Sequence, residues 1–384
     1  MLTVQLTEHQ RGAYAATVAA LLGTESNLKQ TSTTTLFAWF GVLGLLTAHP
    51  SCFRQKLLTP KAAAKKTKNV ATAAKTVTTA VETVATAAET FAAEAADIDL
   101  PVPGEEDLFT LGFTYPIVNS LIEGLTASID PALSAKTRLL QQILHLSKEE
   151  GDTVLVFSAS LQTLNYLDKL FREDNIRSVR IDGSVPTPER TKRLAAFQSD
   201  KGGLDAMLIS TKAGGQGLNI QSANRVVIFD FGFNPAWEEQ AIGRAYRFGQ
   251  QKPVFVYRFV AGGTYEANIY NTQMFKMSLT NRVVDKKNST RNAVRNTKKY
   301  LYPPKDVNHE DLTTELELNL DPKVLSRIMA AQISRGDDRD PSIDICSVRT
   351  MEVLQAEAED APLDESELQQ VEQNNTFWVG GKMV

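Results

Sequence analysis

Short β-branched runs alternate with helix-length amphipathic stretches from residue 151 to residue 284, and this alternation is the strongest constraint on the fold. Such alternation is typical of a parallel sheet covered by helices. It predicts strands at Val154–Ser158, Ser178–Asp182, Ala206–Ser210, Arg225–Phe231 and Val254–Val260. It predicts helices at Leu161–Asp174, Pro188–Ser199, Pro235–Phe248 and Tyr265–Asn281. We therefore expect a doubly wound α/β lobe of about 130 residues.

Composition divides the rest of the chain into segments around this lobe. Residues 1–60 contain predicted helices at Glu8–Leu22 and Leu36–Thr47, and we interpret them as a helical linker or brace region. Residues 61–97 form a low-complexity Ala/Thr/Lys insert that we expect to be mobile. Residues 98–150 are predicted to be a linker and a helix leading into the lobe, residues 151–284. Residues 285–384 are predicted to be a C-terminal extension, first basic, then acidic and partly disordered.

Composition also excludes several classes of protein. The chain is 42% hydrophobic and 22% charged, which argues against a wholly disordered or fibrous protein. Its longest apolar run, Leu36–Leu46, is well short of the roughly 20 residues that span a bilayer, so we expect no membrane segment. Two distant cysteines and four scattered histidines have no metal-ligand spacing. We therefore predict a metal-free protein in a reducing compartment.

Charge is distributed unevenly along the chain. Lys286–Lys305 contains seven basic residues and no acidic one, whereas Glu352–Glu372 contains eight acidic residues and no basic one. A basic stretch favours contact with phosphates, and an acidic tail is typical of a solvated or disordered segment. The sequence thus indicates a nucleic-acid partner for the middle of the chain and possible protein partners for its tail.

The carboxyl ends of the predicted strands are where ligands collect in an open parallel sheet. Ser158 ends the first strand, and Asp182 with Gly183 follows the second. After the third strand comes the loop Ser210–Asn219, which contains three glycines. Glycines let backbone N–H groups approach an anion closely, but a glycine-rich turn taken alone is more often only a turn.

The predicted helix at Pro235–Phe248 carries two arginines. Its spacing places Trp237, Ala241, Ala245 and Phe248 on one apolar stripe. A neighbouring stripe carries Gln240, Arg244 and Arg247. Two interpretations remain open: a solvated helix face, or two guanidinium groups that meet the phosphates of a nucleotide.

Taken in order, these segments resemble one family. RIDGS at 180–184, STKAGGQGLNIQSANRVVIFD at 210–230 and QAIGRAYRFGQ at 240–250 resemble motifs of Swi/Snf-like ATPases of helicase superfamily two. RAYRFGQQKPVFVYRF at 244–259 and SLTNRVVD at 278–285 are most similar to the ATRX-like branch of chromatin remodellers. LTEHQRGAY at 6–14 and LLTAHPSCF at 45–53 resemble the helical linker between the two motor lobes. This resemblance implies a RecA-like C-terminal helicase lobe.

The resemblance also implies site residues, a cofactor and partners. Arg244 and Arg247 correspond to arginine fingers. The nucleotide-binding positions are Gly215, Gly217, Asn219 and Gln240. The positions along the DNA strand are Ser158, Asp182, Gly183, Ser210, Thr211 and Lys212. The implied cofactor is ATP with Mg²⁺, held mainly by a first lobe in cis or in trans. The implied partner is double-stranded DNA or chromatin, and the implied location is the nucleus.

The magnesium and phosphate-loop motifs of such motors are missing from these 384 residues. Nothing matches G-x-x-x-x-G-K-[ST], and no Asp-Glu-x-His box occurs. One hypothesis is therefore the second motor lobe of a DNA-dependent ATPase, inactive without a first lobe. The alternative is a non-catalytic module that binds nucleic acid or protein. An RNA helicase is disfavoured because the RAYRFGQ wording resembles that of double-strand translocases.

Overall fold

A computed structural model describes residues 1–23, 33–58, 113–199, 203–214, 220–230, 232, 235–283, 300–318, 320–335, 344–351 and 353–354. The predicted insert at 61–97 and residues 355–384 of the acidic tail lie outside this described part. The segment boundaries within the chain stay predictions.

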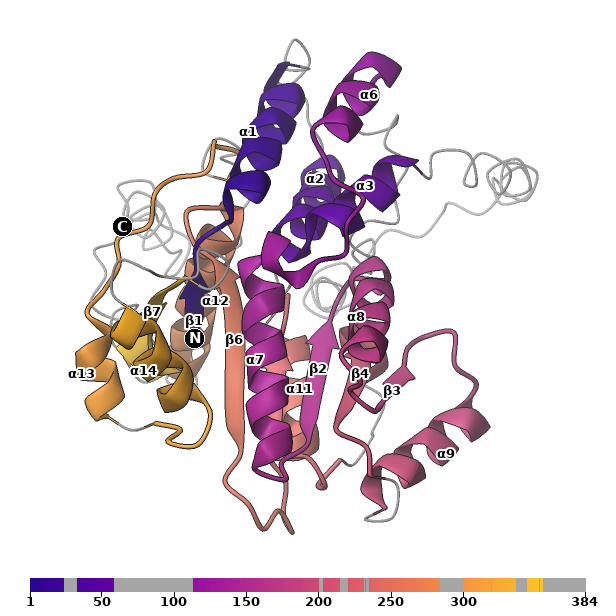
Figure 1. Cartoon of the computed structure of the whole chain (residues 1–384), viewed down its shortest axis with the longest axis vertical. Helices are drawn as coiled ribbons and strands as arrows, with labels where there is room; N and C mark the ends of the chain where they lie inside the picture. The colour runs from indigo at the N-terminus through magenta and orange to yellow at the C-terminus, as the bar shows by residue number, and fades with distance from the viewer. Residues whose placement is uncertain are drawn as a thin grey trace, which may run out of the picture.

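The described strands form one seven-stranded sheet in the order β3-β4-β2-β5-β6-β1-β7 (Figure 1). Their bounds are β1 Leu2–Val4, β2 Val154–Ser158, β3 Ser178–Ile181, β4 Ala206–Ser210, β5 Arg225–Ile228, β6 Phe255–Ala261 and β7 Ile345–Val348. All neighbours run parallel except β7, which is antiparallel to β1. The predicted α/β class with a doubly wound parallel sheet is confirmed.

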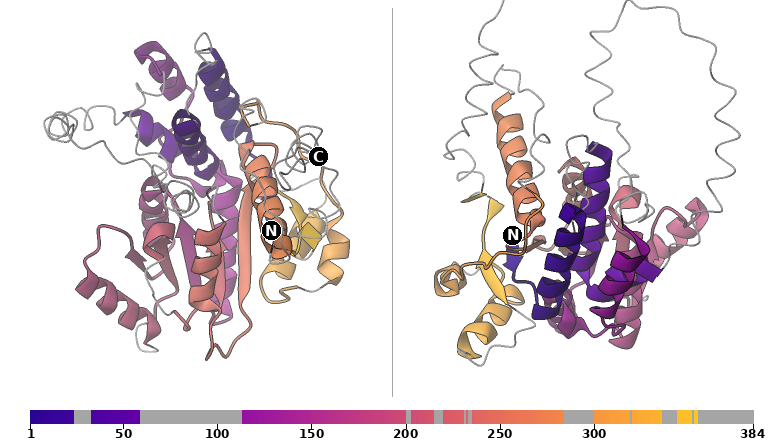
Figure 2. Two further views of the ribbon diagram at one scale, coloured as in Figure 1. Left: turned by 180° about the vertical axis from the view of Figure 1, so that it is seen from behind. Right: turned by 90° about the horizontal axis from the view of Figure 1, so that it is seen from above.

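Helices cover both faces of this sheet (Figures 1 and 2). Their bounds are α1 Glu8–Gly23, α2 Thr33–Ala48, α3 Pro50–Leu58, α6 Tyr115–Glu123, α7 Ala135–Glu149, α8 Leu161–Glu173, α9 Thr187–Gln198, α10 Thr211–Gly214, α11 Ala236–Ala245, α12 Tyr265–Val283, α13 Leu312–Glu317 and α14 Leu325–Arg335. Among the described residues, no helix combines the length and the apolarity needed to cross a membrane.

Two hydrophobic cores correspond to the two faces of the sheet. Val154 and Val156 of β2 belong to the core that α7 and α8 cover. Leu155 and Phe157, which alternate with them, belong to the core that α9 and α11 cover. Successive side chains of a strand point to opposite faces, so an uninterrupted apolar run is required where both faces are buried. This requirement explains why VLVFS and AMLIS were recognisable in the sequence.

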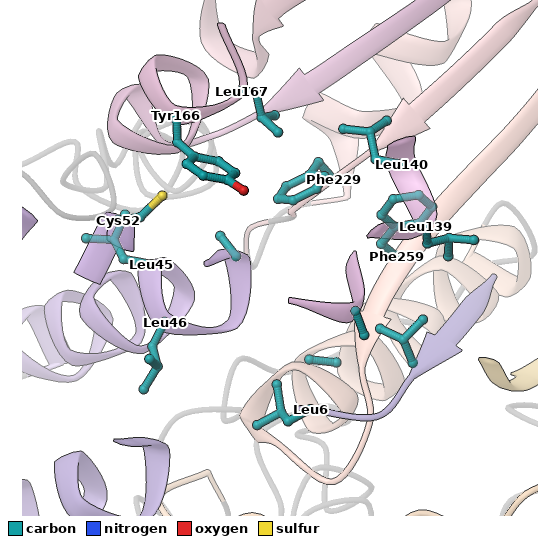
Figure 3. Close-up of a cluster of buried hydrophobic side chains, with 14 of the residues drawn as sticks. Leu6, Leu45, Leu46, Cys52, Leu139, Leu140, Tyr166, Leu167, Phe229 and Phe259 are labelled. Atoms are coloured by element: carbon teal, nitrogen blue, oxygen red, sulfur yellow. The ribbon is translucent and has the colours of Figure 1, made fainter. Parts of the chain in front are cut away.

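The N-terminal helices extend the first core beyond the strand ends. Figure 3 shows Leu45 and Cys52 from this region near Tyr166 of α8. His49, between α2 and α3, stacks on Tyr166 with ring centroids 4.2 Å apart, and its Nε2 lies 2.9 Å from the Asp130 carbonyl. Burial lowers the pKa of His49 to about 4, so this imidazole is neutral at physiological pH. Helices α2 and α3 are thereby packed firmly on the lobe.

Two strands were not predicted from the sequence. Strand β1 pairs with β6 through Leu2↔Phe259, and β7 pairs with β1 through Leu2↔Val348. Each has only three or four residues, which is too short for a recognisable hydrophobic period. The two ends of the described chain therefore extend the lobe's sheet.

Candidate functional site

Ser158, Asp182 and Ser210 lie at the carboxyl ends of β2, β3 and β4, or directly after them. These three strands are neighbours in the sheet, so the structure brings the three side chains to one edge. All three are largely buried, at 0%, 4% and 7% exposure. Gly183, by contrast, is exposed. The residues predicted to lie along a DNA strand are thus grouped at the carboxyl ends of these β-strands, and most of their side chains are buried.

Ser158 is held by a carboxyl group that the sequence analysis did not single out. Its hydroxyl donates to Asp230 Oδ2 at 2.5 Å, and the Ala159 N–H donates to Asp230 Oδ1 at 2.6 Å. Burial, partly offset by these two bonds, raises the pKa of Asp230 to about 6. Asp230 lies near the end of the predicted strand Arg225–Phe231, and a carboxyl group at the carboxyl end of a strand was the available signal. It fixes the geometry of the β2 end.

A buried ion pair lies at the same edge of the sheet. Lys136 Nζ of α7 donates to Glu266 Oε2 at 2.6 Å and to Glu266 Oε1 at 2.8 Å. The Glu266 carboxylate also accepts from the Thr47 hydroxyl of α2 and from the Ala261 N–H. We call Ser158, Asp230, Lys136, Glu266 and Thr47 the carboxyl-end cluster. It connects the N-terminal helices to the strand ends.

Asp182 organises the turn that follows β3. Its carboxylate accepts from the Ser184 N–H at 2.9 Å, from the Ser184 hydroxyl at 2.5 Å and from Arg180 Nε at 2.7 Å. Burial acts to raise the pKa of Asp182, but the bonds from Ser184 and Arg180 outweigh it and lower that pKa. The carboxylate is therefore ionised, and it accepts its hydrogen bonds from residues of its own turn and strand. Gly183 in this turn is exposed to solvent.

The loop after β4 is described only at its start. Ser210 ends the strand, and Thr211 and Lys212 begin the short helix α10. Lys212 is exposed, while the Thr211 hydroxyl is buried and has no hydrogen-bond partner among the described residues. Gly215, Gly217 and Asn219, the predicted nucleotide-binding positions, lie outside the described residues.

Helix α11 is shorter than the sequence predicted. It ends at Ala245, and Tyr246 leaves the helical conformation with φ −85° and ψ 89°. Ala241 and Ala245 are buried as expected, but Phe248 is fully exposed and Trp237 is 43% exposed. The predicted apolar stripe was wrong at Phe248, because the chain has turned away from the helix axis before that residue. It was also wrong at Trp237, which lies within α11 but is partly exposed.

The two arginines consequently differ. Arg244 lies in the last turn of α11 and is half-buried, whereas Arg247 lies beyond the helix and is exposed. Gln240, one helical turn before Arg244, is also exposed. The segment after the helix is fixed by Gln250, whose Nε2 donates to the carbonyls of Gln221 and Ala223 at 3.0 and 2.8 Å. Arg247 is therefore an exposed guanidinium on an anchored turn.

The arginines do not lie at the carboxyl-end edge. The Arg244 carbonyl accepts from the Ile220 N–H at 3.0 Å, and Ile220 precedes β5. Helix α11 starts after β5 and returns toward the amino ends of the strands, and its ten residues span about 15 Å. The structure thus separates the predicted fingers from Ser158 and Ser210 by about one helix length.

A second buried cluster lies at the amino ends of the strands. Arg225 is fully buried; its Nε donates to Asp152 Oδ2 at 2.9 Å, and its Nη1 donates to Asp321 Oδ2 at 2.7 Å. The same Nη1 donates to the Tyr257 hydroxyl, and Lys252 Nζ donates to Asp152 Oδ1 at 2.8 Å. We call these five residues the amino-end cluster. Through Asp321 it holds α14 against the sheet.

Comparison with known proteins identifies the central part of the chain. Residues 135–249 match the helicase conserved C-terminal domain. The chain is 41% identical over 198 residues to the human transcriptional regulator ATRX, which covers 44% of this chain and 8% of ATRX. It is 42% identical over 160 residues to the zebrafish (Danio rerio) DNA excision repair protein ERCC-6-like, covering 41% and 11%. It is 37% identical over 183 residues to the DNA repair protein rhp54 of Schizosaccharomyces pombe, covering 47% and 21%.

Among solved structures, the C-terminal part of the Fun30 ATPase domain superposes with a TM-score of 0.48 at 23% identity, over 71% of this chain and 88% of that one. The chain spans only 8–21% of the three relatives. The matched domain and the relatives confirm the resemblance that the motifs carry. Residues 135–249 therefore match a helicase conserved C-terminal domain, and the chain is similar to the Swi/Snf-like, ATRX-like proteins over this part.

Proposed function

We propose that this chain supplies the second motor lobe of a DNA-dependent ATPase of the chromatin-remodelling type. One observation carries the proposal: a helicase C-terminal domain presents Arg247, exposed and on an anchored turn, directly after the helix that carries Arg244. A fixed but solvent-accessible guanidinium is suited to a phosphate that arrives on another surface.

Arg247 acts in this proposal as an arginine finger, with Arg244 beside it. A guanidinium offers planar, two-pronged donor geometry to the charge that develops on a transferring phosphoryl group. The backbone bond from the Gln250 N–H to the Arg247 carbonyl, at 3.0 Å, holds the turn in place. Gln240, which is exposed on α11, is proposed to contact the nucleotide.

The implied cofactor is ATP with Mg²⁺, and its fit to this chain is partial. Exposed guanidinium donors suit phosphate oxygens, and Arg247 with Arg244 would contact them. The 384 residues contain no G-x-x-x-x-G-K-[ST] motif to cradle the phosphates. ATP supplies the phosphoryl group to be transferred, and we propose that a first lobe supplies the phosphate loop and the magnesium ligands.

The carboxyl-end edge is proposed to follow one strand of double-stranded DNA. Lys212 and Gly183 are exposed there, and we propose that they contact phosphates. Ser158, Asp182, Ser210 and Thr211 are buried, so their proposed role is to shape the backbone at this edge. Phosphate contacts fix register without reading sequence, so binding should show little sequence preference.

The decisive test is Arg247→Ala after a first lobe from an ATRX-like relative has been fused or added. DNA-stimulated ATP hydrolysis should fall by about three to five orders of magnitude, since that is the effect of an arginine finger. Arg247→Lys should rescue little activity. Arg172→Ala, which removes a guanidinium that is 74% exposed on α8, is the matched control and should leave the rate unchanged.

Thermal unfolding and DNA affinity should stay at wild-type values in Arg247→Ala. Near-normal hydrolysis by both Arg244→Ala and Arg247→Ala would refute the finger assignment. The 384-residue chain alone should hydrolyse no ATP above background, with or without DNA. DNA-stimulated turnover by the chain alone would refute its dependence on a first lobe.

DNA binding is tested by its salt dependence. Each phosphate contact on duplex DNA contributes about −0.9 to the log–log slope of affinity against salt. Lys212→Ala should make the slope shallower by about that amount, and Lys192→Ala, an exposed lysine on α9, is the matched control. No DNA binding at low salt would favour the alternative of a protein-binding module, with the acidic tail as its contact. A fluorescent fusion tests the proposed nuclear location.

A further inference from the structure

Three metal-ligating side chains meet in the C-terminal extension, outside the matched helicase domain. His309 Nε2 lies 2.7 Å from Asp344 Oδ1 and 3.8 Å from Cys346 Sγ. One potential ligand atom from each of the three residues lies within 4.8 Å of the other two. The sequence predicted no metal site, because its cysteines and histidines are scattered; His309 and Cys346 are 37 residues apart. The fold brings these two residues close together.

Backbone structure accounts for the meeting. The Glu310 N–H donates to the Cys346 carbonyl at 2.9 Å, which sets the segment of His309 beside β7. Asp344 and Cys346 are two residues apart, at the point where the β1–β7 register shifts, and their ligand atoms lie within 4.8 Å of each other. The Asp344 carbonyl accepts from the Gln5 N–H at 3.1 Å, which fixes this end of β7 to the N-terminal segment.

The donor set and its exposure suit a transition-metal cation. Imidazole nitrogen, thiolate sulfur and carboxylate oxygen are the three ligand types of zinc, and a soft thiolate disfavours magnesium and calcium. Ligand atoms at about 2.0–2.3 Å from a tetrahedral zinc are about 3.3–3.6 Å apart. The distance between His309 Nε2 and Cys346 Sγ is close to this range. Asp344 Oδ1 lies closer to Nε2 than this range and needs to move away from it by about half an ångström. Cys346 is buried, but the His309 and Asp344 side chains are 36% and 21% exposed, which leaves a route from solvent.

We propose that His309, Asp344 and Cys346 bind one Zn²⁺, with water at the fourth position. Binding replaces the thiol proton of Cys346 with the metal, and the proton is released to solvent. The cation joins the segment before α13 to β7, the edge strand of the sheet. Its role is to hold the C-terminal extension on the lobe, independently of any hydrolysis of ATP.

The test uses the 384-residue chain, purified with a chelator and titrated with Co²⁺ as a spectroscopic substitute for zinc. One equivalent should produce visible d–d bands and a near-ultraviolet thiolate-to-cobalt band, and zinc should displace both. Cys346→Ser should abolish the thiolate band, whereas Cys52→Ser, which removes the other cysteine, should retain it. His309→Ala should weaken zinc binding by more than the roughly 10–100-fold that loss of an outer-shell partner costs.

His145→Ala, which removes an exposed histidine on α7, is the matched control for His309→Ala and should bind zinc normally. Zinc should raise the melting temperature of the wild-type chain and of both controls, because it binds the folded state, but not that of Cys346→Ser or His309→Ala. Absence of a thiolate band in the wild-type chain overturns the proposal. So does a band that survives Cys346→Ser.

Discussion

Charged side chains are buried at both ends of the strands, but the pKa values of Asp152 at the amino ends and Asp230 at the carboxyl ends shift in opposite directions. At the amino-end cluster, burial acts to raise the pKa of Asp152, but hydrogen bonds from Lys252 and Asn224 and the charge of Arg225 lower it below its usual value. At the carboxyl-end cluster, burial dominates and raises the pKa of Asp230 to about 6. Two differences accompany the opposite signs: Asp230 lies deeper within the protein, and, of the two, only Asp152 accepts hydrogen bonds from cationic side chains in the described part of the chain.

This difference separates the amino-end cluster, whose role is structural, from the carboxyl-end cluster, where a carboxyl group can change its charge. Asp152 is in contact with two cationic side chains, whereas Asp230 accepts from a neutral hydroxyl and an amide, while Lys136 donates to Glu266 instead. Asp152 therefore stays ionised across the physiological range. Asp230, beside the proposed DNA path, gains a proton close to pH 6.

The largest effect is expected at the amino-end cluster. Arg225→Met leaves the carboxylates of Asp152 and Asp321 buried without their shared guanidinium. Removing one partner of a buried ion pair costs about 3–5 kcal/mol, so the free energy of unfolding should fall by that amount in urea denaturation. Arg172→Met, at an exposed i,i+4 pair with Asp168, should change it by less than about 0.5 kcal/mol. Equal changes in the free energy of unfolding for the two variants would show that the amino-end cluster stabilises the fold no more than a surface ion pair does.

An intermediate effect with a definite pH dependence is expected at Asp230. Because its pKa is higher in the folded chain than the ordinary value of 3.8, the folded state binds the proton more tightly. Its cost to stability is therefore fully present above about pH 6 and disappears as the pH falls toward 3.8. Relative to wild type, Asp230→Asn should be more favourable at about pH 7.5 than at about pH 4.5, by about 1–3 kcal/mol.

Urea denaturation of both proteins at the two pH values measures this difference, and all other titrating groups cancel between them. A pH-independent difference would show that Asp230 titrates alike in the folded and unfolded chains. A difference of the opposite sign would place Asp230 with Asp152, as a carboxylate stabilised by cations.

The smallest effect is expected for Lys252→Met. The Lys252 side chain is 50% exposed, and a pair of that kind contributes about 0.2–1 kcal/mol. Because the pKa of Asp152 is lowered in the folded chain, the contribution of this pair is present above the ordinary carboxyl pKa and is lost on acidification. The variant should therefore approach wild type in acid. A deficit that grows on acidification would contradict the assigned sign.

Much of the lobe could be predicted because its strands are buried on both faces. β4 has the predicted bounds, α8 ends one residue before its predicted end, and α9 differs from its predicted range by one residue at each end. The end of α11 could not be predicted in the same way. GRAYRFGQ continues a helical spacing, and only the bonds of Gln250 to the segment before β5 show where the chain leaves the helix.

The sequence by itself determined the fold class, the motifs and which two arginines are candidates, because apolar period and motif order are local properties of the chain. Only the tertiary structure decided which distant residues meet. Asp321 meets Arg225 across 96 positions, and Lys136 meets Glu266 across 130. The same holds for His309 and Cys346. The His309–Cys346 contact depends on how β7 extends the sheet, and a strand of four residues leaves no periodic signal in the sequence.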